Sequence, residues 1–199
     1  MIGVIDYGLG NMFSLENALK YIGAKFRVIR APEETRAVDA LILPGVGAFP
    51  EGMKKLGAKG MDETVKAWQK PLLGICLGMQ LLFSESEEFT STKGLCLLPG
   101  RVVKIEGSVK VPHMGWNRLD IRFETPLTKG FPKNANAYFV HSFKAEAGAD
   151  IVAASVDYDQ EITAIAARGN VFGTQFHPEK SGDAGLLILE NFARLSKSI

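Results

Sequence analysis

The chain has 199 residues, of which 46% are hydrophobic and 23% are charged, and its formal net charge is +1. Such a composition is ordinary for a globular domain, and the small net charge argues against a nucleic-acid-binding protein. Two cysteines are too few for a disulfide scaffold or a multi-cysteine zinc site, and no apolar run reaches the about 20 residues needed to span a bilayer. We expect one domain, residues 1–199, that works in the cytoplasm without a metal or other cofactor.

The first half of the chain alternates predicted strands with predicted helices. Apolar runs indicate buried strands over Ile2–Asp6, Phe26–Ile29, Leu41–Leu43 and Leu72–Cys76. Apolar spacing and capping residues indicate helices from about Ser14 to Gly23, over Glu51–Leu56, from Asp62 to about Gln69, and over Leu77–Phe83. This alternation is typical of a parallel sheet that is covered by helices on both faces.

The second half contains short β-type runs separated by turn residues. These predicted strands are Leu95–Leu98, Arg101–Ile105, Leu119–Ile121, Ala137–Phe143, Ile151–Val156, Ile162–Ala167 and Val171–Phe176. Only the last segment, about Gly185–Leu195, has helical spacing of its apolar residues. We therefore expect antiparallel strands that extend or flank the parallel sheet, in an order that these patterns do not determine.

Glycine-rich phosphate-binding motifs are absent from the sequence. Gly8-Leu9-Gly10 opens like a dinucleotide-binding motif, but Phe13 stands where the third glycine is needed. No G-x-x-x-x-G-K-[ST] sequence occurs either. Enzymes that cradle a nucleotide phosphate in the common ways are therefore disfavoured.

The strongest local signal for chemistry is Gly74-Ile75-Cys76-Leu77-Gly78, between a predicted strand and a predicted helix. This G-x-C-x-G pattern is the cysteine counterpart of the nucleophile elbow, in which a sharp turn lifts the reactive side chain clear of the sheet. The positive end of the following helix favours a thiolate, and the Leu77 N–H is available as an oxyanion donor. A buried structural cysteine is the alternative, and the flanking glycines favour the nucleophile.

A base for this nucleophile is offered by His177-Pro178-Glu179, which follows a predicted strand. Catalytic side chains collect where the strands of an α/β sheet end. Pro178 favours extended geometry at His177, so His177 and Glu179 project to the same side and the carboxylate can orient the imidazole ring. For the tripeptide alone, a loop histidine beside a solvated glutamate is the alternative.

The remaining cysteine and histidines are weaker candidates. Cys96 lies in an apolar run and is expected to be a buried structural residue. Strand alternation places His141 among phenylalanines, which indicates a packed position with at most a ligand contact, and His113 is expected in a loop without a nearby carboxylate. Cys76 and His177 are therefore the predicted catalytic pair.

Two further segments each have two interpretations. The turn Pro44-Gly45-Val46-Gly47 follows a core strand, where its amides could supply a second oxyanion donor, yet glycine turns are also common connectors. Met114 and Trp116 lie in a predicted loop, where large apolar side chains either form an interface or fold back over the core. The residues alone leave both pairs of interpretations open.

Together these motifs resemble the class I (triad) glutamine amidotransferases. The residues that carry the resemblance are Gly74-Ile75-Cys76-Leu77-Gly78-Met79-Gln80, Pro44-Gly45-Val46-Gly47 and His177-Pro178-Glu179. The branch of the family that supplies ammonia for histidine biosynthesis is similar in four segments: Asp6-Tyr7-Gly8-Leu9-Gly10-Asn11, Pro112-His113-Met114-Gly115-Trp116-Asn117, Tyr138-Phe139-Val140-His141-Ser142-Phe143 and Gln175-Phe176-His177-Pro178-Glu179-Lys180-Ser181. The resemblance implies a three-layer α/β sandwich with a mainly parallel central sheet, helices on both faces and flanking antiparallel strands.

The resemblance also implies a reaction and a set of site residues. Cys76 attacks the side-chain amide of glutamine, and His177, oriented by Glu179, passes a proton to the leaving ammonia. The implied oxyanion donors are Leu77 and, after reorientation of the turn, Val46 or Gly47. The implied contacts to glutamine are Gly45, Gly47, Gln80, His141, Ser142 and Phe143. Ammonia then passes to a (β/α)₈-barrel synthase subunit of a heterodimer, across an interface that includes Asn11, Met114, Trp116, Tyr138 and Lys180.

Two other functions remain open on the sequence. One is a different enzyme on the same scaffold, such as the glutaminase of another ammonia-channelling synthase or a γ-glutamyl peptidase. The other is a catalytically silent structural subunit, which has no reason to retain Cys76, His177 and Glu179 together. The segment around Trp116 disfavours the first alternative, through the family resemblance alone.

Overall fold

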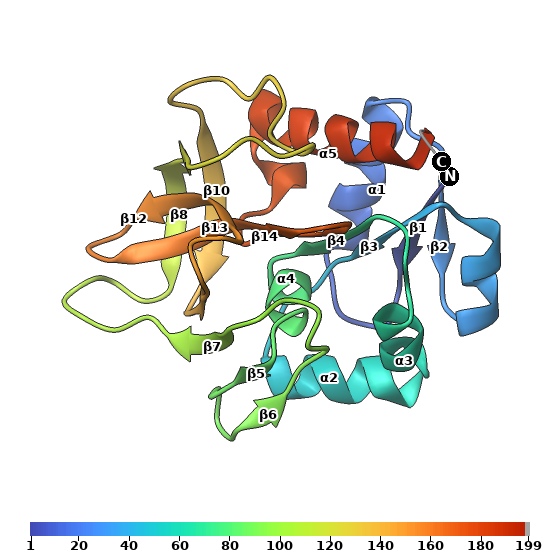
Figure 1. Cartoon of the computed structure of the whole chain (residues 1–199), viewed down its shortest axis with the longest axis horizontal. Helices are drawn as coiled ribbons and strands as arrows, with labels where there is room; N and C mark the ends of the chain where they lie inside the picture. The colour runs from blue at the N-terminus through green and yellow to red at the C-terminus, as the bar shows by residue number, and fades with distance from the viewer. Residues whose placement is uncertain (198–199) are drawn as a thin grey trace.

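An eight-stranded sheet forms the centre of the computed structural model, which describes residues 1–197 (Figure 1). In spatial order, its parallel part consists of β2 (Phe26–Ile29), β1 (Ile2–Ile5), β3 (Ala40–Leu43), β4 (Leu72–Ile75) and β14 (Val171–Thr174). The antiparallel part continues through β13 (Glu161–Arg168), β12 (Val152–Asp157) and β9 (Asp120–Ile121). The sheet is thus mainly parallel, with an antiparallel extension at one side.

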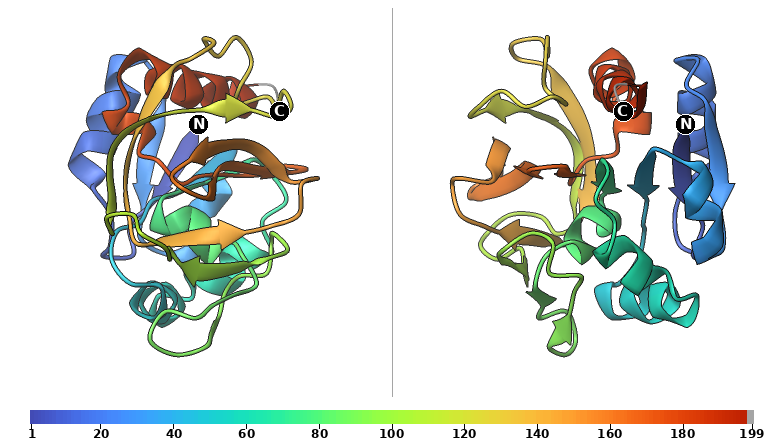
Figure 2. Two further views of the ribbon diagram at one scale, coloured as in Figure 1. Left: turned by 90° about the vertical axis from the view of Figure 1, so that its left-hand side faces the viewer. Right: turned by 45° about the vertical axis from the view of Figure 1, so that its right-hand side comes forward.

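Helices cover both faces of this sheet, which makes three layers (Figures 1 and 2). One face carries α1 (Met12–Tyr21) and α5 (Gly182–Lys197), and the other carries α2 (Phe49–Ala58), α3 (Met61–Lys66) and α4 (Leu77–Leu81). Alternation along β3 sends Ile42 into the core below α1 and α5, and Leu41 and Leu43 into the core against α2, α3 and α4. Within residues 1–197, no helix is long and apolar enough to cross a membrane.

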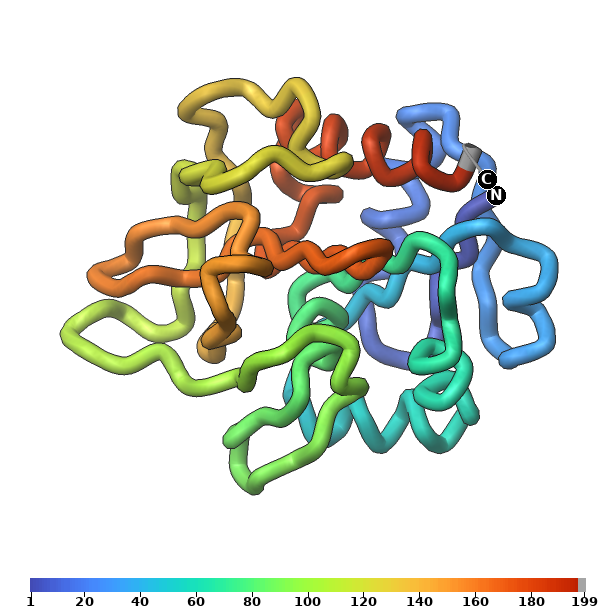
Figure 3. The backbone as a smooth tube through the Cα atoms, in the orientation of Figure 1, coloured from blue at the N-terminus to red at the C-terminus, as the bar shows by residue number. Residues whose placement is uncertain are grey.

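A group of antiparallel strands lies on the side of the molecule away from β2 (Figures 1 and 3). It consists of the pair β8 (His113–Arg118) and β10 (Asn136–His141), and of a sheet of β11 (Phe143–Glu146), β7 (Arg101–Lys104), β5 (Glu85–Ser86) and β6 (Thr92–Lys93). The single residue Ser142 separates β10 from β11, so one segment serves both groups. The His177 N–H, just beyond β14, donates a 3.1 Å hydrogen bond to the Tyr138 carbonyl oxygen, which attaches β10 to the carboxyl edge of the parallel strands.

The alternating first half of the sequence folds as predicted. Each predicted strand and helix of this half is present, with ends that differ by a few residues. Gly23 follows α1 with φ of 67°, the left-handed conformation that stops a helix. Helix α2 continues through Gly57, where the sequence predicts its end, to Ala58, and Gly60 follows it with φ of 65°. The short turn η1 (Pro32–Ala37) connects β2 to β3.

The predictions for the second half need three corrections. Val171–Phe176, expected among the antiparallel strands, becomes β14, which is parallel to β4 and antiparallel to β13. Leu95–Leu98 forms no strand, because its N–H groups donate to carbonyl oxygens at the end of α4 and just beyond it. Residues 113–118 are strand β8 instead of a loop; Gly115 and Asn117 have low strand propensity, and pairing with β10 overrides it.

Cys96 is a further correction, because its side chain is exposed and not buried. It occupies a turn with φ of 56°, in which the Cys96 N–H donates to the Phe83 carbonyl oxygen. The neighbouring Leu95 and Leu98 take the buried positions of this segment. The apolar run therefore does contribute to the core, but the turn directs the cysteine to solvent.

Candidate active site

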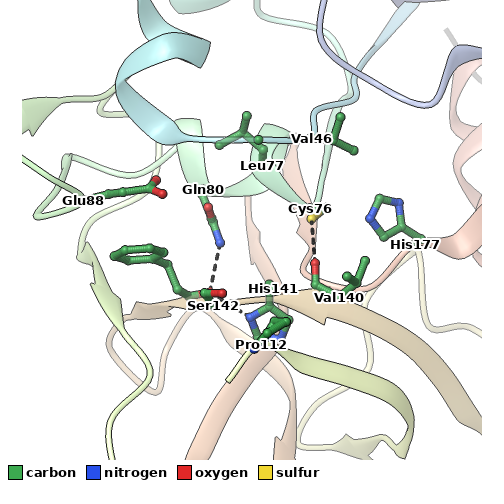
Figure 4. Close-up of a pocket in the computed structure, with 12 residues that line it drawn as sticks. Val46, Cys76, Leu77, Gln80, Glu88, Pro112, Val140, His141, Ser142 and His177 are labelled. Carbon is green, nitrogen blue, oxygen red and sulfur yellow. Dashed lines mark hydrogen bonds between the residues drawn. The ribbon is translucent and has the colours of Figure 1, made fainter. Parts of the chain in front are cut away.

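A cavity of about 370 Å³ opens at the carboxyl edge of the parallel sheet (Figure 4). Its walls come from the turn after β3, the junction of β4 and α4, the segment after β14 and residues 140–143, with single residues from two further loops. The lining residues are Val46, Gly47, Cys76, Leu77, Gln80, Glu88, Pro112, Val140, His141, Ser142, Phe143 and His177. Ligands of open α/β sheets bind at this edge, and the volume suits a small metabolite.

Cys76 lies at a sharp turn between β4 and α4. Its backbone angles, φ 54° and ψ −111°, are ones that a non-glycine residue adopts only when its surroundings impose them. The Cys76 N–H donates to the Thr174 carbonyl oxygen at 2.7 Å, and the Cys76 carbonyl oxygen accepts from the Gln80 N–H at 3.1 Å. The predicted strand–turn–helix is confirmed, and the turn presents the sulfur to the cavity (Figure 4).

The two glycines that flank Cys76 allow other backbone to approach the turn closely. A Cβ atom on Gly78 would lie 1.8 Å from the Leu43 carbonyl oxygen, and one on Gly74 would lie 2.6 Å from the Gly78 carbonyl oxygen. Both distances are far below van der Waals contact, so no larger residue fits without displacing backbone. The spacing of the G-x-C-x-G motif thus follows from the packing of β3 and α4 around the turn.

His177 follows β14, and its imidazole ring lies beside the Cys76 sulfur (Figure 4). Its Nδ1 atom is 2.7 Å from Glu179 Oε1, and both side chains are only 3% exposed. The other ring nitrogen, Nε2, has no hydrogen-bond partner within residues 1–197. The predicted pairing of His177 with Glu179 is present, but its geometry differs from the prediction. His177 itself is extended, whereas Pro178–Lys180 form a short 3₁₀ turn, and this turn rather than extended alternation brings the carboxylate to the ring and leaves Nε2 for a reacting group.

The surroundings of His177 favour its protonated form. Burial by itself lowers the pKa of this imidazole, but interaction with the Cys76 sulfur and then with the Glu179 carboxylate outweighs burial and raises the pKa to about 10. An imidazolium beside a cysteine stabilises the thiolate, the nucleophilic form. Cys76, His177 and Glu179 therefore have the arrangement of a nucleophile, an acid–base group and an orienting carboxylate.

The turn after β3 packs against the start of α4 on the far side of Cys76. Val46 and Gly47 line the cavity, and Gly47 has φ of 103°. Leu77 is the first residue of α4, where N–H groups have no partner inside the helix. Gly45, expected to contact glutamine, lies outside the cavity lining; a Cβ there would meet Tyr7 Oη at 2.6 Å, so its small size serves packing.

Gln80, His141, Ser142 and Phe143 line one wall of the cavity. The Phe143 carbonyl oxygen accepts two hydrogen bonds, from Gln80 Nε2 at 3.0 Å and from His141 Nδ1 at 2.8 Å. The side chains of Gln80 and His141 are both buried, so this wall is held by bonds within the protein. The buried position of His141 agrees with the packed position that strand alternation predicts, and its ring borders the cavity.

Three buried polar residues at or next to the cavity are missing from the sequence predictions. Glu88 lines the cavity, and its Oε2 atom accepts a 2.7 Å hydrogen bond from the Phe49 N–H. Burial raises the pKa of the Glu88 carboxyl, and the Phe49 hydrogen bond opposes that rise. Gln175 and His113 are buried behind the lining residues. The sequence signals for these residues are that Gln175 and His113 both lie in segments that carry the family resemblance; Glu88 has none.

The residues predicted to form an interface gather around β8, β10 and the short turn η2 (Pro178–Lys180). Met114 and Trp116 are 61% and 58% exposed, and the Trp116 ring packs edge-on against Tyr138 at 6.0 Å between centroids. Asn11 caps the start of α1, and Lys180 is exposed at the end of η2. Met114 and Trp116 thus project from a paired strand and do not fold back over the core.

Known proteins share the sequence pattern of the whole chain. The model of the family "Glutamine amidotransferase class-I" matches residues 3–195, so the chain belongs to the class I glutamine amidotransferases. The chain is 50% identical over 195 residues to the imidazole glycerol phosphate synthase subunit HisH of Bacillus cereus (strain G9842), covering 96% of this chain and 93% of the relative. It is 48% identical over 204 residues to the same subunit of Shouchella clausii (strain KSM-K16), covering 98% of each.

Solved structures share the fold. A crystal structure of a glutamine amidotransferase superposes with a TM-score of 0.78 at 21% identity, covering 98% of both chains. The crystal structure of a putative GMP synthase subunit from Thermoplasma acidophilum superposes with a TM-score of 0.76 at 23% identity, covering 99% of this chain and 94% of that one. The predicted family, enzyme class and three-layer α/β fold are confirmed.

Proposed function

We propose that this chain is the glutaminase subunit of imidazole glycerol phosphate synthase, and that residues 1–199 form its single glutaminase domain. The observation that carries the proposal is Cys76, held at a strained turn in a cavity beside an imidazole that a buried carboxylate orients. The two HisH relatives support this choice within the family. We place the protein in the cytoplasm, where its two free cysteines stay reduced.

The reaction follows from the positions of the three catalytic groups. The Cys76 thiolate forms a C–S bond to the side-chain carbonyl carbon of glutamine, and the C–N bond breaks as His177 donates its proton to the leaving ammonia. Water then adds to the γ-glutamyl thioester while neutral His177 takes a proton from it, the C–S bond breaks, and glutamate leaves with the Cys76 thiolate and protonated His177 restored. Glu179 keeps the imidazole oriented, with Nε2 toward the reacting atoms, in both steps.

The negative charge that develops on the amide oxygen needs N–H donors close to Cys76. Leu77 at the start of α4 supplies one, and Val46 or Gly47 supplies the other from the turn after β3. A Cβ atom on Gly47 would meet nothing within 4 Å, so space is available around Gly47 for the turn to reorient. Both donor segments line the same cavity as the sulfur.

The amino-acid end of glutamine fits the wall opposite the sulfur. The Glu88 carboxylate supplies a negative charge for the α-ammonium group, in a buried position where such an interaction is strong. Both N–H groups of the Gln80 amide donate to protein oxygens, at Phe143 and Gln175, so its Oε1 atom is left as an acceptor for the ligand. His141, Ser142 and Phe143, which line the same wall, complete the binding site for glutamine.

The exposed and half-buried residues around β8, β10, η2 and the start of α1 form the proposed docking face for a (β/α)₈-barrel synthase subunit, which forms a heterodimer with this chain and consumes the ammonia. Its members are Asn11, Met114, Trp116, Tyr138 and Lys180. Exposed methionine and aromatic side chains on a rigid strand are typical anchors of protein interfaces. The face adjoins the catalytic site, because the backbone of Tyr138 bonds directly to the backbone of His177.

Glutamate release with and without the synthase subunit of the same organism tests this function. We expect slow hydrolysis by the chain alone and faster hydrolysis when the synthase subunit, with its nucleotide ligand, is present. Trp116→Ala is expected to weaken binding of that subunit by about tenfold or more, whereas Tyr21→Ala, which removes a still more exposed aromatic from α1, leaves binding unchanged. A synthase subunit that neither binds nor stimulates the chain would reject the partner and leave only a class I glutaminase.

Removing the charge of Glu88 is expected to weaken glutamine binding. Loss of a charge-assisted hydrogen bond costs about 1.5–3 kcal/mol, so Glu88→Gln should raise KM for glutamine about 10- to 100-fold, with a smaller change in kcat. Glu87→Gln is the matched control, since the Glu87 side chain is exposed and pairs with Arg101. Steady-state kinetics of both variants measure this effect. Equal KM values for Glu88→Gln and Glu87→Gln would mean that the α-ammonium group of glutamine binds elsewhere.

A further inference from the structure

A chain of hydrogen bonds runs through the protein behind the cavity wall and reaches the Cys76 sulfur, whose S–H in turn points to the Val140 carbonyl oxygen at 4.0 Å (Figure 4). Gln175 is its innermost member, with 0% of the residue exposed. The Gln175 Nε2 atom donates to Cys76 Sγ at 3.8 Å, and its Oε1 atom accepts from Gln80 Nε2 at 3.0 Å. The side chain is placed there by strand pairing, because β14 and β4 run parallel and end side by side.

From Gln80, this chain of hydrogen bonds continues to the outer strands β11, β10 and β8. The second donor of the Gln80 amide bonds the Phe143 carbonyl oxygen, which also accepts from His141 Nδ1. On the other side of the His141 ring, Nε2 lies 3.0 Å from His113 Nδ1. His113 therefore stands at the far end, on the first residue of β8, stacked between Phe139 and Tyr158 at centroid distances of 4.9 and 4.0 Å.

The Phe143 carbonyl oxygen can only accept hydrogen bonds, and this determines which atom is the donor in the other hydrogen bonds of this chain of bonds. A carbonyl oxygen only accepts, so His141 Nδ1 carries the proton toward Phe143. Burial lowers the pKa of His113 and lowers that of His141 to about 4, so both rings are neutral. His141 Nε2 is then an acceptor, and His113 Nδ1 must be the donor that fills it.

We propose that this hydrogen-bond chain makes Gln175 a catalytic residue, which stabilises the Cys76 thiolate through its amide N–H, and His113 a positioning residue, which fixes the tautomer and orientation of His141 in the glutamine-binding wall. A donor that points at sulfur favours the negative charge, and Gln175 cannot turn its oxygen toward the sulfur without losing the bond from Gln80. The role of His113 rests on the proposed glutaminase function, whereas the role of Gln175 concerns the thiol itself.

Alkylation of Cys76 without glutamine tests the Gln175 end of the chain. Iodoacetamide is reacted over a range of pH with the Cys96→Ala protein, which removes the exposed second thiol, and modified Cys76 is followed by peptide mass. Gln175→Met, an apolar side chain of similar shape, is expected to slow alkylation at neutral pH about tenfold and to move its midpoint to higher pH. Gln175→Glu adds a charge and should move it further in the same direction.

Gln69→Met is the matched control for these variants, because Gln69 is exposed and precedes β4, at the opposite end of this strand from Cys76. It should alkylate like the parent protein. Parent-like rate and midpoint in Gln175→Met would overturn the assignment, and Gln175→Glu decides the question if the methionine variant does not fold. The result does not depend on glutamine hydrolysis, so a failed proposed function leaves the Gln175 test intact.

Two substitutions separate the hydrogen bond of His113 from its packing. His113→Asn keeps an N–H donor near the position of Nδ1 and loses the ring, whereas His113→Phe keeps the stacked ring and loses the donor. We expect KM for glutamine to rise about three- to tenfold in His113→Phe, with kcat less affected, and to stay within about twofold in His113→Asn. The opposite order, or equal losses in both variants, would show that ring packing alone matters and would overturn the positioning role.

Discussion

Replacement of Cys76 by alanine is expected to abolish glutamine hydrolysis, with a loss of about 10⁴-fold or more. Without the sulfur no thioester forms, and the imidazole of His177 has no nucleophile to activate. The change removes one atom from a largely buried position, so the fold should persist, as circular dichroism would show. Glutamate release from the complex is the measurement, and Cys96→Ala is the control that should keep full activity.

Covalent labelling checks the same assignment without mutation. An electrophile that mimics glutamine is expected to modify Cys76 and to spare Cys96. The comparison is stringent, because Cys96 is the more exposed of the two thiols. Equal labelling would mean that accessibility alone governs the reaction, and full activity of Cys76→Ala would remove Cys76 as the nucleophile.

Substitution of Glu179 by glutamine is expected to lower the rate of hydrolysis by about 10²- to 10⁴-fold. A neutral amide in place of the carboxylate no longer dictates which nitrogen of His177 carries the proton. The Glu179 carboxylate is also one of the groups that raise the pKa of His177 to about 10, so its loss lowers that pKa. The ring then loses its proton at lower pH, and the alkaline limb of the pH–rate profile should move to lower pH.

NMR titration of the His177 ring, together with the pH–rate profile, measures both effects. Glu190→Gln is the control, since it neutralises an exposed carboxylate on α5 and should change neither. An unchanged alkaline limb in Glu179→Gln would show that Glu179 does not set the protonation of His177. An unchanged rate would remove it from the catalytic machinery.

The catalytic motifs could be predicted from the sequence because they depend on neighbours only a few residues apart. Gly74 and Gly78 flank Cys76 because backbone passes within contact of the turn, and the apolar residues before Cys76 already indicate a strand. Pro178 restricts the backbone of His177 in the same local way. Such short-range constraints are visible in the order of residues, and the family resemblance then supplies glutamine as the substrate.

The strands around the cavity were harder to predict, because long-range pairing outweighs local preference there. Residues 113–118 contain Gly115 and Asn117 and resemble a loop, yet the segment forms β8 when it pairs with β10. Cys96 is a second example, in which the apolar run around it indicates burial but a turn exposes its side chain. The spacing of apolar residues predicts neither outcome, because both depend on segments that are distant in the sequence.

By itself, then, the sequence determined the family and predicted a nucleophile, its base and an orienting carboxylate. Only the tertiary structure decided which buried polar groups meet them: Glu88 in the cavity, and Gln175 and His113 behind its wall. Gln175 and Cys76 are 99 residues apart and touch only because β14 and β4 end side by side. The physical reason is that a buried donor or acceptor must find its partner across the fold, and residue order does not record where that partner will be.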